Sequence, residues 1–560
     1  MTGSVTGAHG QRAHIARELE NVAPGDRVNV IVRFRNTPGA GQNQIIRDLG
    51  GAVTRSLASI QGGAYAVPGS ALGSLAANPE VLSVSPDRPV HMLLDNTTAA
   101  VNAPVAWNAG LDGSGIGVAV IDSGISDHDD LLRGGASRIV YRESFTGGDG
   151  NDRFGHGEHV AGIIAGNGAD SSCATCTRHL VGLAPNVNLI DLQVLDGDGE
   201  GTDSAVIAAI ERTIQLKSQF NIRVINLSLG RPVYESYLLD PLCQAVESAW
   251  QAGIVVVVAA GNGGRDNSAG NNGYGTITVP GNDPYVITVG AMKSFGTPQR
   301  SDDRIASYSS KGPTQVDHIV KPDLVAPGNL VVSLLSGNSA LAKSFPNNVV
   351  PVNYFQQTSL ATPSSSYFTM SGTSMAAPVV SGAAALLLQS HPEWTPDQVK
   401  SKLMKTAYKS FPQSSTAHDP NTGQSYTSEY DVFTVGAGYV DIQAALADTT
   451  TPRASALSPV ANYSRGLIST VFGLLGLSKA TISCDSTTVC APTGLQSVWG
   501  TQSVWGTQAI TNDQTVWGDQ SVWGTQSVWG TQSVWGTDSV SATASTDPAT
   551  GKKVVMTGEQ

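Results

Sequence analysis

The sequence is poor in cysteine and in charged residues. Five of its 560 residues are cysteines, too few for a disulfide scaffold, and 14% are charged. The net charge is −12 without a basic cluster, which argues against a nucleic-acid partner. No apolar run reaches the ~18–20 residues of a membrane span, and residues 1–20 lack the apolar core of a signal peptide. We therefore expect no membrane span; either the protein stays inside the cell or this chain begins after an export signal.

The cysteines suggest local links at most. Cys173 and Cys176 have the spacing of half a zinc site or a redox motif, but no second such pair follows. A disulfide or two free thiols in a surface loop is the favoured reading. Cys484 and Cys490 would close a small loop in an oxidising compartment, leaving Cys243 unpaired in a helix.

Glycine, in contrast, is abundant. The 62 glycines and 40% hydrophobic residues are typical of a compact α/β protein with many tight turns, and the length predicts two to four domains. Residues 1–94 carry eight basic and six acidic groups (+2), residues 95–448 carry 20 and 33 (−13), and residues 449–560 carry five and six (−1). The first two segments are thus mildly complementary in charge.

Two patterns of secondary structure follow one another. Residues 1–94 predict a βαββαβ order, which is that of a small ferredoxin-like α+β domain. From residue 95 the apolar strands are continuous, as in a parallel sheet covered by helices on both faces, where ligands bind beyond the carboxyl ends of the strands. The expected strands are 28–34, 52–57, 63–67, 81–84, 117–121, 224–227, 254–260 and 286–289, and the expected helices are 39–49, 70–78, 157–165, 203–217 and 241–252.

Four polar residues stand where elements begin or end. Asp122 and Asn262 follow strands, His156 opens a helix, and Ser374 lies in the first turn of a buried helix after a small-residue turn. Each has an ordinary structural alternative, as a turn residue or a helix cap. Together they supply the hydroxyl, base, orienting carboxylate and oxyanion donor that acyl transfer requires.

The surrounding motifs resemble those of the subtilisin-like serine proteases over residues 95–448. The resemblance implies a doubly wound, mostly parallel sheet and a serine endopeptidase. It implies that Asp122 orients His156, that His156 is the base, that Ser374 attacks the peptide carbonyl, and that Asn262 with the Ser374 N–H stabilises the oxyanion. The motifs are Asp122-Ser123-Gly124, His156-Gly157-x-His159-Val160-Ala161-Gly162, Ala260-Gly261-Asn262 and Gly372-Thr373-Ser374-Met375-Ala376-x-Pro378, in the family's order.

The same resemblance implies how substrate and partners bind. Ser228, Leu229, Gly230 and Gly261 would bind a polypeptide substrate, the first three by adding it as a strand. We expect an apolar P1 residue. Residues 1–94 would be an inhibitory propeptide, self-cleaved within residues 91–96, in a secreted, extracellular enzyme. The alternative is a permanently attached accessory domain.

Some positions depart from the family. Glu158 replaces a common threonine and would either raise the pKa of His156 or face solvent. Asp130 matches a calcium ligand of some relatives, but residues 171–178 replace the loop that would complete that site. We therefore assign no metal ligands and expect no required cofactor, with calcium left open as a structural ion. Between Gly328 and Ser371 lie about twenty more residues than in minimal relatives of the family; this polar segment, rich in Ser and Asn, is expected to be a surface insertion.

The tail after residue 448 divides into a linker (449–495), Gln-Ser-Val-Trp-Gly-Thr repeats (496–537) and a terminal segment (538–560). A six-residue period places every indole on one face of an extended chain. Three interpretations remain: repetitive β-structure, a strip that binds the cell envelope, a sugar or another surface, and a low-complexity segment without a fixed fold. The repeat tryptophans are Trp499, Trp505, Trp517, Trp523, Trp529 and Trp535.

Two other classes of function compete. Gly372-x-Ser374-x-Ala376 is close to the nucleophile motif of an α/β-hydrolase esterase, but that fold needs its Asp and His after the serine. A protease-like adhesion protein would have broken catalytic positions, whereas all four are present.

Overall fold

The computed structural model describes residues 13–15, 19, 22–57, 60–86, 96–268, 270–359, 361–419, 422–450, 455–464, 479–483 and 558–559. The chain divides into two compact units, Met1–Met92 and Leu93–Gln560. The sequence analysis placed that boundary after residue 94. Cys484, Cys490, the tryptophan repeats and most of the predicted cleavage segment lie outside the described residues.

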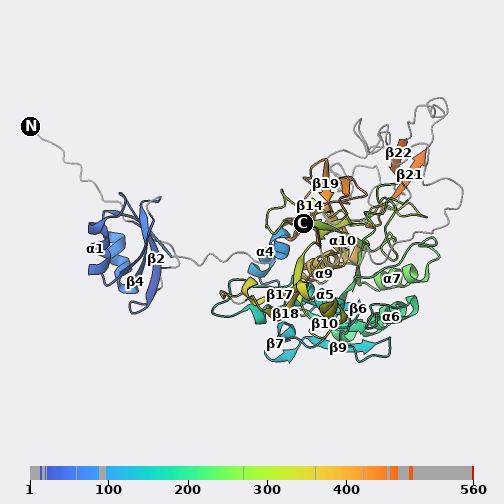
Figure 1. Ribbon diagram of the computed structural model, residues 1–560, viewed down its shortest axis with the longest axis horizontal. Helices are drawn as coiled ribbons and strands as arrows, with labels where there is room; N and C mark the ends of the chain where they lie inside the picture. Colours follow the sequence, from blue (N-terminus) through green and yellow to red (C-terminus); the bar gives the residue numbers. More distant parts are fainter. Residues whose placement is uncertain are drawn as a thin grey trace, which may run out of the picture. The chain divides into compact units, whose positions relative to one another are not determined.

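The smaller unit is an antiparallel sheet with two helices (Figure 1). Strand β2 lies between β5 and β4 and is antiparallel to both, and β3 completes the far edge. This interleaved order is the ferredoxin-like arrangement expected from the sequence. A short β1 adds itself parallel to β5. The elements are β1 (His14–Ile15), β2 (Arg27–Phe34), α1 (Ala40–Asp48), β3 (Ala52–Leu57), β4 (Gly62–Pro68), η3 (Gly69–Ala71), α2 (Leu72–Ala77) and β5 (Val81–Pro86).

An eight-stranded sheet forms the centre of the larger unit. Its strand order is β14-β13-β12-β11-β6-β10-β9, with β15 pairing with β13. All the pairs are parallel except that of β14 with β13. Strands β6, β12 and β13 are buried along their whole length, which explains their continuous apolar sequences. The bounds are β6 (Gly117–Asp122), β9 (Ile139–Ser144), β10 (Asn188–Gln193), β11 (Ile222–Leu227), β12 (Val255–Ala259), β13 (Ile287–Lys293), β14 (Arg304–Ile305) and β15 (Leu324–Pro327).

Helices cover the sheet in two groups. Helices α5 and α9 pack against each other and on the sheet, while α6 and α7 pack as a second pair against β6, β11 and β12. Figure 1 shows α6 and α7 together at one side of the larger unit and α9 in its interior. The bounds are α3 (Asn96–Ala100), α4 (Ala103–Asn108), α5 (His156–Ala165), α6 (Asp203–Phe220), α7 (Pro241–Gln251), α8 (Ala340–Ser344), α9 (Thr373–Ser390), α10 (Pro396–Thr406) and α11 (Ile442–Ala447).

Helix α9 is long and apolar enough, by length and composition, to cross a membrane. However, 83% of that 18-residue window is buried inside the fold. Its many alanines and Gly382 allow close packing, since a Cβ at Gly382 would lie 2.3 Å from the Leu183 Cβ. The helix is therefore a core element of the larger unit.

The segment between Gly328 and Ser371 is more than a surface insertion. It folds into a three-stranded sheet of β16 (Val331–Leu334), β18 (Pro363–Met370) and β17 (Val349–Pro351). Tyr367 and Phe368 of β18 are buried. Most described residues between 337 and 363 are exposed or half-buried, so the expected surface insertion stays a prediction.

Short elements and the single disulfide of the described residues complete the larger unit. Cys173 and Cys176 form a disulfide, so the alternative of two free thiols is wrong. Cys243 is a buried free thiol in α7, as expected. Strands β21 and β22 pair within the segment predicted to be a linker, so that prediction is wrong at those residues. The remaining elements are η4 (Asp129–Leu131), β7 (Leu132–Arg133), β8 (Ala136–Ser137), η5 (Ala169–Ser171), η6 (Pro346–Asn348), η7 (Val352–Tyr354), β19 (Ser414–His418), β20 (Ser425–Glu429), β21 (Val460–Ser464) and β22 (Lys479–Ser483).

Candidate active site

His156 and Asp122 form a buried pair beyond the end of the central strand. Asp122 is the last residue of β6, and His156 is the first residue of α5. The His156 Nδ1 lies 2.7 Å from the Asp122 Oδ1, which also accepts the Ser123 N–H at 2.8 Å. Burial by itself lowers the pKa of His156, but the charge and hydrogen bond of Asp122 outweigh it, so the pKa is raised above 6.5. The carboxylate thus holds the ring and favours its protonated form.

A second carboxylate, Asp152, holds the start of α5. Its Oδ1 accepts the Gly155 N–H at 2.6 Å and the Ser123 hydroxyl at 2.9 Å, and its Oδ2 accepts the Glu158 N–H at 2.8 Å. Burial raises the pKa of Asp152 to about 6 despite these donors. The sequence analysis missed this residue. The available signal was an acidic side chain just ahead of a helix whose N-cap, Gly155, has no side chain.

Ser374 lies in the first turn of α9 and does not cap the helix. The N-cap is Gly372, and the Ser374 hydroxyl donates instead to the Ser228 carbonyl at 3.1 Å. The capping alternative is therefore wrong. The structure shows no hydrogen bond between Ser374 and His156, both of which are among the described residues; such contacts often tighten only when substrate binds.

Asn262 presents an amide beside the Ser374 backbone. Its Oδ1 accepts the Thr373 N–H at 2.9 Å, which fixes the side chain and turns the Nδ2 the other way. A Cβ at Gly372 would lie 3.4 Å from the Asn262 Nδ2 and 3.7 Å from the Ser374 N. The Asn262 amide and the Ser374 backbone nitrogen therefore lie close to the same glycine. An oxyanion hole needs such an arrangement.

The predicted substrate segment follows β11. Ser228 is buried and Gly230 is exposed. A Cβ at Gly230 would lie 2.7 Å from the Thr278 Oγ1, so a side chain there would clash with the neighbouring loop. Gly261 donates its N–H to the Thr373 Oγ1 at 3.1 Å. The structure therefore brings Ser228 and Gly261 into contact with the first turn of α9, which carries Ser374.

Glu158 does neither of the things expected from the sequence. It is fully buried on α5, and its Oε2 accepts the Ser126 N–H at 2.5 Å. Burial, followed by the charge of Asp152, raises the pKa of Glu158 well above its usual value. The rise in the His156 pKa comes from Asp122 and Asp152.

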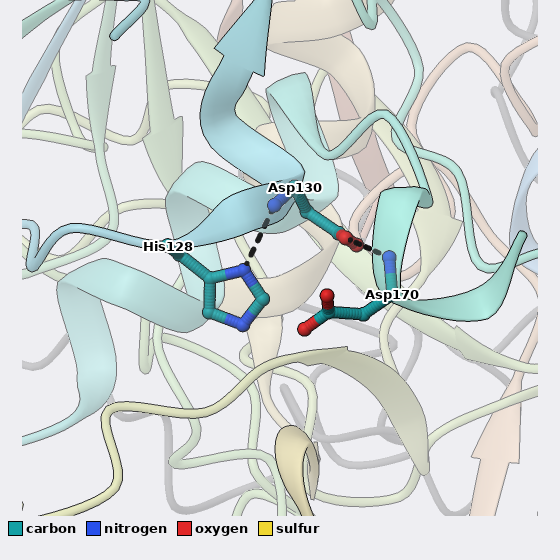
Figure 2. A group of neighbouring side chains, drawn as sticks. All are labelled: His128, Asp130 and Asp170. Atoms are coloured by element: carbon teal, nitrogen blue, oxygen red, sulfur yellow. Dashed lines mark hydrogen bonds between the residues drawn. The ribbon is translucent and has the colours of Figure 1, made fainter. Parts of the chain in front are cut away.

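His128, Asp130 and Asp170 form a group of candidate metal ligands, with ligand atoms within 4.8 Å of one another. Figure 2 shows the carboxylates of Asp130 and Asp170 and the ring of His128 facing a common space. Asp130 is the residue that resembles a calcium ligand of some relatives. Two of the three residues offer oxygen atoms, which Ca²⁺ prefers.

Protein donors already contact both carboxylates of this group. Asp130 accepts the Asp170 N–H at 2.7 Å and the Tyr367 hydroxyl at 2.9 Å, and Asp170 accepts the Ser366 hydroxyl at 2.5 Å. The His128 Nδ1 accepts the Asp130 N–H at 3.1 Å, and its Nε2 lies 3.1 Å from the Ser366 carbonyl. A ring nitrogen is also a poor calcium ligand. These residues do not fit a calcium ion.

Comparison with known proteins shows which family the chain resembles. The model of the subtilase family matches residues 113–438. Serine protease AprX of Bacillus subtilis (strain 168) is 41% identical over 345 residues, which cover 60% of this chain and 71% of that protein. Subtilisin E of Bacillus subtilis (strain 168) is 35% identical over 386 residues, covering 67% and 84%. The crystal structure of a cold adapted subtilisin-like serine proteinase is 30% identical and covers 53% of this chain and 84% of that chain, with a TM-score of 0.38.

The family match and the similar proteases show that the chain is a serine endopeptidase. The chain belongs to the subtilase family. The esterase and adhesion alternatives are thereby set aside.

Proposed function

We propose that Ser374, His156 and Asp122 are the catalytic triad of this endopeptidase and that Asn262 completes its oxyanion hole. The observation that carries the proposal is the 2.7 Å contact between the His156 Nδ1 and the Asp122 Oδ1. It leaves the Nε2 of the ring as the atom that can take a proton from a nucleophile.

The proposed reaction begins when the Ser374 Oγ attacks the scissile carbonyl and gives its proton to the His156 Nε2. The Asn262 Nδ2 and the Ser374 N–H donate to the oxyanion. His156 then gives the proton to the leaving amine, and an acyl-enzyme remains. A water molecule then gives a proton to the His156 Nε2 and attacks the acyl carbonyl. His156 returns the proton to the Ser374 Oγ as the acyl group leaves, which frees Ser374.

The proposed substrate is an extended polypeptide. Gly230 is exposed and follows the carboxyl end of β11. A substrate strand that pairs with this segment would lie near Ser374, because Ser228 contacts Ser374. We retain the expectation of an apolar P1 residue from the family resemblance. The three interpretations of the tryptophan repeats, which lie outside the described residues, stay predictions.

We propose further that residues 1–94 are a self-cleaved inhibitory propeptide. A ferredoxin-like fold and a charge of +2 against −13 for residues 95–448 support this role. Cleavage is expected within residues 91–96. The enzyme would act outside the cell, as the family resemblance implies.

Mass spectrometry of purified protein after incubation alone tests these proposals. The mass of the wild type should fall by that of about 94 N-terminal residues, because the cut is expected within residues 91–96. The mass of Ser374→Ala should not change. Ser218→Ala, on the exposed side of α6, serves as the matched control and should process like the wild type. If the wild type stays intact but still cleaves casein, the self-cleaved propeptide is rejected while the proposed protease activity stands. A processed Ser374→Ala protein would reject the nucleophile.

A further inference from the structure

A buried acidic residue from the end of the tail lies on the larger unit. Glu559 is 5% exposed although it follows the long segment of tryptophan repeats in the sequence. Burying a carboxylate is costly unless charged and polar donors compensate it. The surroundings of Glu559 must therefore contain such donors.

Arg265 and Ser307 provide them. The Glu559 Oε1 accepts the Arg265 Nη2 at 2.7 Å and the Ser307 N–H at 2.9 Å, and it also accepts the Ser307 hydroxyl. Arg265 is held independently of Glu559, because its Nη1 pairs with Asp419 at 3.0 Å and its guanidinium lies 4.7 Å from the centre of the Tyr426 ring. The cation is thus oriented by its own unit.

Asn329 binds the backbone of Glu559. Its Oδ1 accepts the Glu559 N–H at 2.9 Å, and its Nδ2 donates to the Glu559 carbonyl at 3.0 Å. This pairing of one amide side chain with both backbone groups resembles a single rung of a sheet. The next residue, Leu330, has a φ of 54°, an uncommon conformation for a bulky side chain.

The preceding residue must be glycine. Gly558 has a φ of 65°, and a Cβ there would lie 2.4 Å from the Leu330 Cδ2 and 2.9 Å from the Ser371 Oγ. The contacts therefore select a glycine followed by an acidic residue. Ser371 lies three positions before Ser374, so the bound dipeptide packs beside the loop of the nucleophile.

We propose that Arg265, Ser307 and Asn329 form a docking site for the chain's own Gly558–Glu559 segment. The tail then has two attachments to the larger unit. The other lies at its start, where Val320 donates its N–H to the Pro459 carbonyl at 2.8 Å and Ala461 to the His318 carbonyl at 2.8 Å. Because the ligand is tethered, even a weak site stays filled through its effective concentration.

Hydrogen-exchange mass spectrometry on the full chain tests the docking, with Ser374→Ala present to prevent self-digestion. In Glu559→Ala the Ser307 amide should exchange at least about tenfold faster, since its acceptor is gone. The matched control is Glu211→Ala, which removes an exposed carboxylate from α6 and should leave that rate unchanged. Equal Ser307 rates in the parent and Glu559→Ala would overturn the proposal.

A peptide experiment then tests selectivity. A fluorescent peptide of residues 551–560 is titrated into the full Glu559→Ala chain, whose own segment has lost the carboxylate that Arg265 and Ser307 bind. It should bind, and the same peptide with Gly558→Ala, which has equal charge, should bind at least about tenfold more weakly because its Cβ clashes with Leu330. No binding up to about 1 mM peptide, the scale of effective concentration that a tether supplies, would contradict a built site. Equal binding of the two peptides would also contradict it, because unspecific charge attraction would then account for the binding.

Discussion

Ser228 and Ser374 exchange hydrogen bonds: the Ser374 hydroxyl donates to the Ser228 carbonyl at 3.1 Å, and the Ser228 hydroxyl donates to the Ser374 carbonyl at 2.8 Å. The second bond has a clear cause. The Ser374 carbonyl would normally accept the N–H of the residue four positions on, which is Pro378 and has none. Ser228 replaces the missing bond of the helix.

Ser228→Ala should therefore destabilise the protein by about 1 kcal/mol, because a part-buried carbonyl loses its donor. Urea unfolding of the Ser374→Ala background measures the effect without self-digestion. Ser228→Thr keeps a hydroxyl and should remain closer to the parent. Equal midpoints for the alanine variant and the parent would show that this bond contributes nothing.

Asp122→Asn should reduce kcat by about 10⁴-fold, the scale seen when a triad histidine loses its carboxylate. The pH dependence gives a second test. His156 must be neutral to act as a base, so kcat/KM should rise with pH through its pKa, which Asp122 raises above 6.5. An acidic limb at or below 6.5 in the parent would contradict this assignment.

Asn262→Ala should lower kcat by about 10²–10³-fold while KM changes little, because the Nδ2 acts on the oxyanion more than on the ground-state carbonyl. Steady-state kinetics on a short peptide ester or amide separates the two constants. A large rise in KM with constant kcat would instead make Asn262 a substrate-binding residue.

Chelation should not weaken the region around Asp130, since protein donors satisfy its carboxylate. The shift in unfolding temperature between calcium and chelator should be the same for the parent and for Asp130→Asn, and we expect it to be zero in Asp130→Asn. A midpoint that falls with chelator in the parent but not in Asp130→Asn would show that calcium binds at Asp130.

Asp323 joins two buried lysines, Lys321 at 2.7 Å and Lys400 at 3.2 Å. Burial alone raises the pKa of Asp323, but the two lysines outweigh it and the pKa is lowered. The resulting stability is present above the ordinary value of 3.8 and is lost as pH falls through the lower folded value. Asp323→Asn should cost about 3–5 kcal/mol at neutral pH, because it leaves buried cations unpaired. A loss below about 1 kcal/mol, which is typical of an exposed ion pair, would contradict the stabilising role of this buried cluster.

The sequence predicted most of the fold because the responsible signals are local. Continuous apolar runs marked β6, β12 and β13, and the order of elements in residues 1–94 matched the sheet that forms. The predicted positions at strand ends placed Asp122 and Asn262 correctly relative to their elements. No strand was expected between Gly328 and Ser371, yet β16, β17 and β18 form there and bury Tyr367 and Phe368.

Residue types and their order along the chain determined the family, the parallel sheet and the four candidate catalytic residues, since each depends on short motifs at element ends. Tertiary structure alone decided how polar groups are satisfied. It pairs Asp130 with Tyr367, 237 residues away, and Asn329 with Glu559, 230 residues away. It also makes Asp152 the anchor of α5 and gives the Ser374 carbonyl its donor. Such partners depend on distances in space that no local pattern encodes, because a buried polar group needs a donor or acceptor wherever the chain can supply one.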